Sequence, residues 1–263
     1  MAETKPRSNS NRPVFITGAS RGIGAAAARE FAKRGHSVAL SARNKDAIEQ
    51  RAQEIRAAGG DAIAVPCDVG DPAQVERAIA SAVAQLGGLG IVINNAGTIE
   101  PLARIADADM RQWARAMEVN LNGPIYVMHY AAPHLPKGGV VINITSGAGE
   151  RALTGRSAYC ASKAGLMIAS RIFAIEETET RGIRVIGFSP GYVDTEMNAL
   201  NRDHRMGNAG NINVADLRPP EETAQLIAWL TSPDAAHLNG TIVNAREPEL
   251  RRAAGVAMLP DSR

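Results

Sequence analysis

Residues 17–24 read TGASRGIG, and this stretch decides the fold. It follows a short apolar run at 14–16 and opens an amphipathic stretch at 22–34. Its glycines, Gly18, Gly22 and Gly24, permit a tight turn and let the backbone approach a pyrophosphate, whose charge is favoured at a helix N-terminus. The stretch therefore predicts the first strand, turn and helix of a dinucleotide-binding fold. It is not a P-loop, because no G-K-[ST] follows.

The same alternation of apolar runs and amphipathic stretches continues along the chain. Strands are expected at 14–16, 37–40, 62–65, 91–93, 140–144, 184–188 and 241–243. Helices are expected at 22–34, 45–58, 72–86, 107–132, 155–180 and 220–230. Short apolar runs that alternate with helices are typical of a parallel sheet covered on both faces. We therefore expect an α/β fold: a single Rossmann-like, doubly wound domain with a seven-stranded, mostly parallel sheet.

The domain is expected to span residues 13–250, between a flexible N-terminal tail at 1–12 and a C-terminal tail at 251–263. One internal stretch, 192–218, shows no sustained period and is dense in asparagine and glycine. Loops of this length in a compact domain are usually functional. This stretch, called the substrate loop below, is expected to cover the substrate, with a plain surface insertion as the alternative.

Composition excludes several classes of protein. The 263 residues carry a formal net charge of +2, and 4% of them are aromatic. This composition indicates neither a strongly basic surface nor an aromatic stacking platform for nucleic acid. The two cysteines cannot build a disulfide scaffold and, with five scattered histidines, match no zinc-site spacing, so no metal is expected. No apolar run approaches the ~18 residues that span a membrane, and the polar N-terminus lacks a signal-peptide core. A cytoplasmic protein without membrane or nucleic-acid partners is expected.

The end of the second expected strand indicates which dinucleotide binds. An acidic residue there would hydrogen-bond a ribose 2′-hydroxyl and select NAD. The strand instead reads VALSAR and ends on Arg43, and Arg21 in the glycine turn can approach the same point. Arginine suits a phosphate because its guanidinium binds in a bidentate manner. These residues favour NADP, with NAD as the weaker alternative.

A second motif places Tyr159 and Lys163 four residues apart, on one face of the expected helix. The preceding strand, 140–144, is followed by Ser146 and a loop that leads back to this helix. Ligands of parallel sheets bind at the carboxyl ends of strands. Ser146, the NNAG stretch at 94–97 and the glycine turn are therefore expected along one edge.

Taken together, TGASRGIG, Asp68, NNAG, Asn120 in VNLNG, Ser146, YxxxK and Pro190-Gly191 resemble the short-chain dehydrogenase/reductase family in type and order, over about residues 13–197. The resemblance implies an NADP-dependent enzyme that reduces a carbonyl, or oxidises an alcohol, by hydride transfer. Tyr159 would be the general acid/base, its pKa lowered from ~10 by the ammonium of Lys163. Ser146 would bind the substrate oxygen, and Asn120 would hold a water that resupplies protons.

The resemblance also implies contacts with the cofactor. Lys163 would hold the nicotinamide ribose, Asp68 the adenine amino group, and Thr195 the carboxamide or pyrophosphate. The expected cofactor-binding residues are Gly18, Ser20, Arg21, Gly22, Ile23, Gly24, Arg43, Asp68, Val69, Asn95, Ala96, Gly97, Tyr159, Lys163, Pro190, Gly191, Val193 and Thr195.

The substrate is a small carbonyl or alcohol compound that the sequence leaves unnamed. Arginines in and before the substrate loop, including Arg156, are compatible with an anionic compound. The chain after the last strand, AREPELRRAAG, lacks the glycine pair usual in 3-oxoacyl-[acyl-carrier-protein] reductases and resembles general carbonyl reductases of the family. A homodimer or homotetramer is expected by resemblance, through the helices expected at 107–132 and 155–180.

Two other functions are open at this point. Residues 187–191, GFSPG, match the G-x-S-x-G motif of serine hydrolases, but the residue after the serine is Pro190, which has no N–H for an oxyanion hole. A non-catalytic NADP-binding regulator with the same fold is the second alternative. Such a protein can dispense with tyrosine or lysine, whereas this chain keeps Asn120, Ser146, Tyr159 and Lys163.

Overall fold

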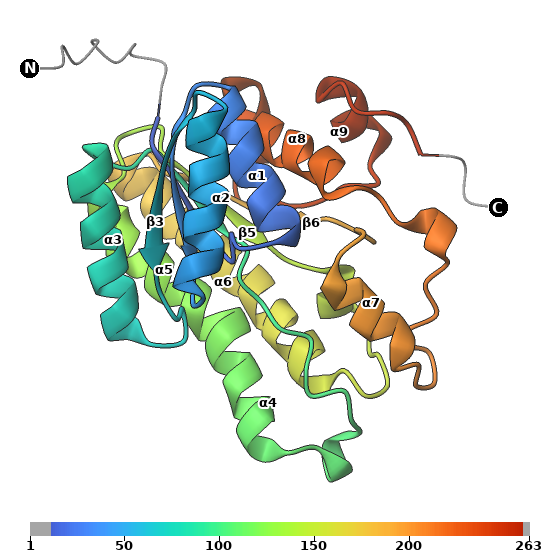
Figure 1. Cartoon of the computed structure of the whole chain (residues 1–263). Coiled ribbons are helices and arrows are strands. Elements are labelled where there is room, and N and C mark those ends of the chain that lie inside the picture. Colours follow the sequence, from blue (N-terminus) through green and yellow to red (C-terminus); the bar gives the residue numbers. More distant parts are fainter. Residues whose placement is uncertain (1–11, 260–263) are drawn as a thin grey trace, which may run out of the picture.

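The computed structural model describes residues 12–259, so residues 1–11 of the tail expected at 1–12 and residues 260–263 of the tail expected at 251–263 lie outside the described residues. The strands are β1 (Val14–Thr17), β2 (Ser37–Ala42), β3 (Asp61–Pro66), β4 (Ile91–Asn94), β5 (Val140–Ile144), β6 (Arg184–Ser189) and β7 (Ile242–Asn244). The helices are α1 (Gly22–Lys33), α2 (Lys45–Ala57), α3 (Pro72–Leu86), α4 (Met110–Met117), α5 (Gly123–Ala131), α6 (Ser157–Arg181), α7 (Glu196–Asp203), α8 (Pro220–Leu230) and α9 (Pro248–Ala253) (Figure 1).

The seven strands form one sheet in the order β3-β2-β1-β4-β5-β6-β7, with every pairing parallel, and this confirms the predicted architecture. The chain moves outward from β1 to β3 and then crosses back to β4. The strand order therefore reverses between β1 and β4, whose residues pair from Val14 with Ile91 to Ile16 with Ile93. Such a reversal opens a crevice at the carboxyl ends of the two strands, where ligands of open α/β sheets bind.

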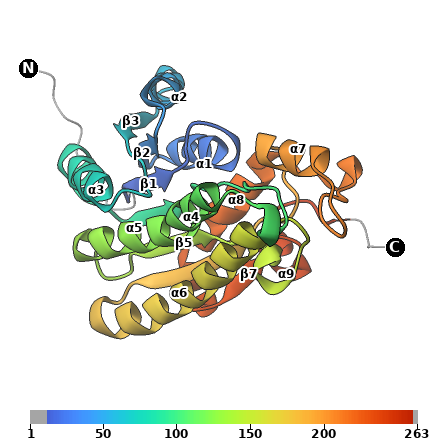
Figure 2. The ribbon, with the colours of Figure 1, turned by 90° about the horizontal axis from the view of Figure 1, so that it is seen from below.

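Helices cover both faces of the sheet, as the view along it shows (Figure 2). On one face, Val14 and Ile16 pack with apolar side chains of α1, α2 and α8, among them Phe31. On the other face, Phe15 packs with α3, α5 and α6, through residues such as Ile79. The alternation of Val14, Phe15 and Ile16 between the two cores follows from the period of two along a strand. Burial on both faces explains why the strands read as continuous apolar runs.

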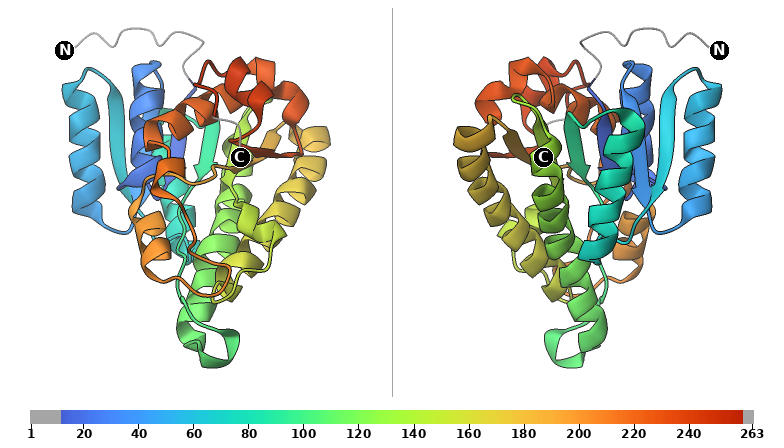
Figure 3. Two further views of the ribbon diagram at one scale, coloured as in Figure 1. Left: turned by 90° about the vertical axis from the view of Figure 1, so that its right-hand side faces the viewer. Right: turned by 90° about the vertical axis from the view of Figure 1, so that its left-hand side faces the viewer.

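The helix expected at 107–132 is interrupted, which corrects the prediction. It consists of α4 and α5, joined by a π-helical turn at Glu118–Asn122 that contains Asn120. A π turn inserts a residue into the helical repeat and is frequent at functional sites. Figure 3 shows α4 (green) reaching beyond the end of the sheet.

The substrate loop is not irregular throughout, which is a second correction. It contains α7 and a 3₁₀ turn at Val214–Asp216. Thr195 caps α7, because its hydroxyl accepts a hydrogen bond from the Asn198 N–H at 3.4 Å. This short helix has no buried residue, so no sustained apolar period marks it in the sequence.

The expected boundaries at 12 and 250 do not separate tails from the domain. Arg12 donates hydrogen bonds to the carbonyls of Gly138, at 3.1 Å, and Thr231, at 2.7 Å. Arg251 in α9 is 2% exposed and pairs with Glu222 of α8 at 2.5 Å. The packed domain therefore includes residue 12 and α9, and Val256 beyond it is also buried.

Helix α6 is long and apolar enough to cross a membrane by length and composition alone, which the sequence analysis did not anticipate. Part of that composition lies on its inner side, where Ala158, Leu166, Met167 and Ala174 are buried against the rest of the domain. The other part is exposed, at Ile168, Ile172 and Ile175.

Candidate active site

The glycine turn lies where β1 meets α1, at the crevice. Gly18 and Gly22 have φ of 65° and 55°, in the left-handed region that favours glycine. A Cβ on Gly18 would lie 2.8 Å from the Cα of Ala96, and one on Gly24 would lie 2.4 Å from the carbonyl oxygen of Gly18. No side chain caps α1, so its first N–H groups remain available to an anion. The half-buried Ser20 and Ile23 belong to the same turn and helix start.

Asn95 ties the end of β4 to this turn. Its side-chain amide donates hydrogen bonds to the carbonyls of Thr17 at 3.0 Å and Gly18 at 3.1 Å. The Thr17 hydroxyl in turn accepts hydrogen bonds from the backbone N–H groups of Asn95 at 3.0 Å and Ala96 at 3.1 Å. Asn95 thus fixes the two strand ends that flank the crevice, as expected. Thr17 shares this task, which the sequence analysis missed.

The two arginines expected at the cofactor ribose have different surroundings. Arg43 is exposed directly after β2. Its charge acts on Asp68 and contributes to lowering the pKa of that carboxyl group. Arg21 forms an ion pair with Glu196 of α7, in which both side chains are about 70% exposed. The glycine turn and the substrate loop therefore meet, and a Cβ on Gly22 would lie 3.2 Å from Cγ2 of Thr195.

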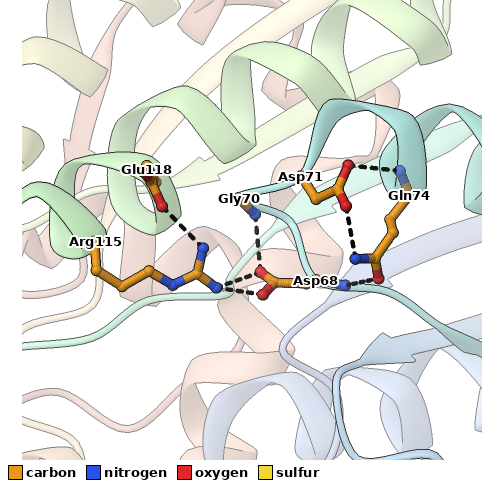
Figure 4. A network of polar contacts seen from close by, with 6 residues as sticks. All are labelled: Asp68, Gly70, Asp71, Gln74, Arg115 and Glu118. Carbon is orange, nitrogen blue, oxygen red and sulfur yellow. Dashed lines mark hydrogen bonds and ion pairs between the residues drawn. The ribbon is translucent and has the colours of Figure 1, made fainter.

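Asp68 follows β3 and is held by a network of polar contacts (Figure 4). Arg115 of α4 contacts both of its carboxylate oxygens, and the Gly70 N–H donates to Oδ1 at 3.0 Å. Partial burial alone would raise the pKa of Asp68, but the hydrogen bonds from Arg115 and Gly70 keep it below its ordinary value. Val69, the next residue, is buried, and its Cγ2 would lie 2.9 Å from a Cβ on Gly123.

Ser146, Tyr159 and Lys163 come together at the carboxyl end of β5. Ser146 lies close enough to Tyr159 for its side chain to lower the pKa of the phenol. The Lys163 amine lies 5.8 Å from the centroid of the Tyr159 ring and donates to the Ile144 carbonyl at 2.7 Å. Lys163 is 4% exposed, so burial lowers its pKa from 10.5 to about 8.

The expected lowering of the Tyr159 pKa is not found. Burial raises the pKa of this phenol, and the Ser146 side chain only partly offsets that effect. The physical reason is that Lys163 directs its amine at the Ile144 carbonyl, so the phenolate gains little from the lysine while it loses hydration.

Asn120 is fully buried in the π turn and bonds outside its own helix. Its Oδ1 accepts from the Thr98 N–H at 2.8 Å, and its Nδ2 donates to the Thr98 carbonyl at 2.8 Å and to the Ser162 hydroxyl at 3.1 Å. A Cβ on Gly97 would lie 3.3 Å from Oδ1 of Asn120 and 3.9 Å from the Lys163 amine. Gly97 therefore lies between the strand end at the cofactor crevice and the Ser146–Tyr159–Lys163 group.

The chain after β6 borders the same edge. Gly191 has φ 70°, which favours glycine, and Pro190 precedes it. Val193 is buried and forms a bridge with Arg218, so the two ends of the substrate loop are fastened together. Thr195 reaches Gly22, as described above. The crevice thus brings together expected cofactor-binding residues that follow β1, β4 and β6, while Asp68 follows β3 at the same edge of the sheet.

The guanidinium of Arg156 is buried and its N–H groups are engaged within the chain, so it is not exposed to a substrate. Its side chain is 1% exposed and donates to the Asn201 side chain at 2.9 Å and to the His204 carbonyl at 2.7 Å. Within residues 12–259, all of its hydrogen-bond acceptors are neutral. Arg156 therefore fastens the end of α7 to the start of α6, three residues before Tyr159.

Ser189 is unsuited to act as a hydrolase nucleophile. It is 4% exposed, and its hydroxyl already accepts the Gly147 N–H at 3.0 Å. Pro190 follows it without an N–H. Separately, the described residues contain no group of three or more His, Cys, Asp or Glu side chains placed to hold a metal ion.

The fold and the edge described above define an α/β protein built to bind a dinucleotide beside a tyrosine–lysine pair. Comparison with known proteins specifies it further. The family model for short chain dehydrogenases matches residues 12–206. The chain belongs to the short-chain dehydrogenase/reductase family and is an oxidoreductase, which excludes the hydrolase alternative.

Individual relatives agree in length as well as in sequence. A cyclohexanol dehydrogenase from Acinetobacter sp. is 34% identical over 88% of this chain and 92% of its own. A meso-2,3-butanediol dehydrogenase from Serratia marcescens is 32% identical over 88% and 91%. The crystal structure of a short chain dehydrogenase from Burkholderia cenocepacia in complex with NADP is 30% identical, has a TM-score of 0.80, and covers 91% of this chain and 97% of that one.

Three residues of the site were not predicted from the sequence. Thr98 and Ser162 hold Asn120, and Arg115 holds Asp68. Ser162 lies within the YxxxK motif, and this position is the one feature of the sequence that indicates a role at the site. Arg115 and Thr98 meet partners 47 and 22 residues away along the chain, and such contacts leave no local pattern.

Proposed function

We propose that this protein transfers a hydride between NADPH and a small carbonyl compound, with Tyr159 as the general acid/base. The observation that carries the proposal is the grouping of Ser146, Tyr159 and Lys163 at the edge where the glycine turn opens: the Lys163 amine lies 5.8 Å from the centroid of the Tyr159 ring, and Ser146 acts on the pKa of the phenol. The nicotinamide supplies or accepts the hydride when it is bound. The residues of the chain donate the proton and bind the substrate oxygen.

In this proposal Ser146 and Tyr159 bind the substrate oxygen, and Tyr159 protonates it. A substrate oxygen that lies between Ser146 and Tyr159 receives one hydrogen bond from each hydroxyl, and these bonds stabilise charge as it develops. Tyr159 then gives its proton to the oxygen. Because burial raises the pKa of Tyr159, the phenol is fully protonated and ready to act as an acid at neutral pH.

Lys163 and Asn120 support the tyrosine. In this proposal the Lys163 ammonium, mainly protonated at neutral pH because its pKa is about 8, turns from the Ile144 carbonyl toward Tyr159 and the cofactor, and so stabilises the phenolate that forms. Lys163 also binds the nicotinamide ribose in this proposal. Asn120 holds the water that returns a proton, and its fixed bonds to Thr98 and Ser162 orient it for that role.

We infer a preference for NADP over NAD from Arg43 and from the absence of a carboxylate in β2 (SVALSA). Arg43→Asp should raise the KM for NADPH relative to that for NADH by about a hundredfold, because a bidentate phosphate contact becomes a repulsion. Steady-state kinetics with both cofactors measure this ratio. The control is Arg51→Asp, the same charge change on α2; an equal ratio in both variants would contradict the role of Arg43.

The substrate remains a small-molecule alcohol or ketone in this proposal, and the relatives that oxidise cyclohexanol and butanediol agree with that class. The engaged donors of Arg156 and the uncharged compounds in the names of these relatives favour an uncharged compound over the anionic one considered from sequence.

A homodimer or homotetramer in the cytoplasm, without membrane or nucleic-acid partners, completes the proposal. Its support is an exposed apolar stripe on α6, where Ile168, Ile172 and Ile175 are 54%, 49% and 71% exposed. Such a stripe at helical spacing on a surface helix is typical of a protein contact.

The test is NADPH oxidation by the pure protein over a panel of cyclic ketones, diketones, acyl thioesters and pteridines, with Tyr159→Phe as the blank. Consumption that depends on Tyr159 supports the proposal, and the best substrate defines the class. NADPH binding without turnover on the whole panel favours the alternative of a non-catalytic NADP-binding regulator.

A further inference from the structure

The carboxylate of Asp68 is engaged by a residue that belongs to a distant part of the chain. Arg115 projects from α4 toward the end of β3, and its Nη2 atom contacts both Oδ1 and Oδ2 of Asp68 (Figure 4). Its Nη1 atom donates to Glu118 at 3.1 Å. The guanidinium is therefore anchored on its own helix and reaches across to Asp68.

The packing around this pair leaves little freedom. A Cβ on Gly70 would lie 2.2 Å from Nη1 of Arg115, so the guanidinium rests directly on the turn after β3. The side chains of Arg115 and Asp68 are only 34% and 26% exposed. Partly buried, charge-assisted hydrogen bonds of this kind are stronger and more directional than exposed ion pairs.

The other side of Asp68 is fixed as well. The Gly70 N–H donates to Oδ1, and the backbone N–H of Asp68 donates to the Gln74 side chain at 3.1 Å. Gln74 is itself held by Asp71 at 2.8 Å. Oδ1 thus accepts two hydrogen bonds, whereas Oδ2 accepts only from Arg115 and keeps a lone-pair position for one further donor.

We propose that Arg115 is a cofactor-positioning residue, which orients the free lone pair of Asp68 toward the exocyclic amino group of adenine and makes the site selective for that amino group. The inference rests on the proposed cofactor-binding role of Asp68. Without Arg115 the carboxylate rotates and hydrates, so the hydrogen bond to the amino group weakens. The loss appears in the KM and Kd of the cofactor rather than in kcat.

The probe that isolates this effect is the reduced nicotinamide hypoxanthine dinucleotide phosphate, which carries an oxygen in place of the adenine amino group. The measured quantity is the ratio of its Kd to that of NADPH, obtained by fluorescence titration. The wild type should bind NADPH about tenfold more tightly than the hypoxanthine analogue, the value expected for a hydrogen bond to a charged acceptor. A purely structural role for Arg115 would weaken both cofactors equally and leave this ratio unchanged.

The variants are Arg115→Met, Arg115→Lys and Asp68→Asn, with Arg111→Met as the matched control. Arg111 lies one turn earlier on α4 and is exposed. In Arg115→Met the ratio should fall to about one to threefold, while Arg111→Met keeps the wild-type ratio. Arg115→Lys keeps the charge but loses the planar guanidinium, so its ratio should lie between the two. Thermal melting shows which variants fold. If Arg115→Met does not fold, Arg115→Lys alone tests the positioning role.

The outcomes separate this inference from the proposed function. If Asp68→Asn loses the selectivity and the Arg115 variants keep it, Arg115 has no positioning role, and the cofactor role of Asp68 stands. If the wild type does not distinguish the two cofactors, the adenine contact of Asp68 fails and the inference fails with it. Hydride transfer through Tyr159 is tested separately, by turnover.

Discussion

Lys163 is the residue whose burial has the clearest energetic consequence. Burial lowers its pKa from 10.5 to about 8, so between these values the unfolded chain holds a proton that the folded chain has lost. The free energy of unfolding therefore rises as the pH rises from about 8 to 10.5. Below pH 8 the folded chain carries the full cost of a buried charge, about 3 kcal/mol at about 1.4 kcal/mol per pKa unit.

Lys163→Met should consequently stabilise the protein at pH 7 while it removes turnover. The lost hydrogen bond to the Ile144 carbonyl offsets part of the gain, which leaves about 1–2 kcal/mol. Chemical denaturation at pH 7 and at pH 10 measures the difference, which should shrink at the higher pH. A variant less stable than the wild type at pH 7 would mean that the buried ammonium is better compensated than its surroundings indicate.

The sequence predicted these chemical residues through their motifs, but not their mutual geometry. Tyr159 and Lys163 are four residues apart, so one helix face was expected and found. That the lysine bonds the Ile144 carbonyl instead of pairing with the phenol depends on how β5 meets α6. Such a tertiary contact, like that of Arg115 with Asp68, has no periodicity that a single sequence reveals.

At the scale of elements, the substrate loop is fastened to the segment before α6. Arg156 bonds Asn201 and His204, and the Asn208 side chain accepts from the Thr154 N–H at 2.9 Å. A Cβ on Gly155 would lie 2.6 Å from the sulfur of Met206, so the two segments pack closely. Movement of α7 is therefore coupled to the start of the helix that carries Tyr159.

Arg156→Met should loosen α7 and raise the substrate KM about tenfold, because three hydrogen bonds to the substrate loop are lost. Hydrogen exchange of residues 196–204 should become faster, while β5 keeps its protection. The control is Arg205→Met, an exposed position in the same loop. Unchanged exchange in Arg156→Met would show that the loop is held by other contacts.

The elements themselves were largely predictable, since buried strands and amphipathic helices differ in period. All seven strands lie where apolar runs were found. The π turn between α4 and α5 was not predictable, because its Asn120 bonds Thr98 and Ser162, which lie 22 and 42 residues away along the chain. Helix α7 was missed because its polar composition gives no periodic signal.

At the scale of the whole molecule, the exposed stripe on α6 predicts association between copies of this chain. Ile172→Glu places a charge in the middle of the stripe and should shift the protein toward the monomer. Light scattering coupled to size-exclusion chromatography measures the mass. The control is Arg171→Glu, on the neighbouring exposed position. A wild type that is already monomeric would contradict the expectation.

The proposed hydride transfer depends most directly on Tyr159 as the proton donor. Single-turnover oxidation of NADPH tests this role. With the best substrate of the panel, Tyr159→Phe should lower the rate by about 10²–10⁴-fold while the Kd of NADPH changes by less than about threefold. Tyr126→Phe, at a half-buried tyrosine of α5, should keep the wild-type rate. Oxidation of NADPH by Tyr159→Phe at the wild-type rate would contradict the role of Tyr159 as the proton donor.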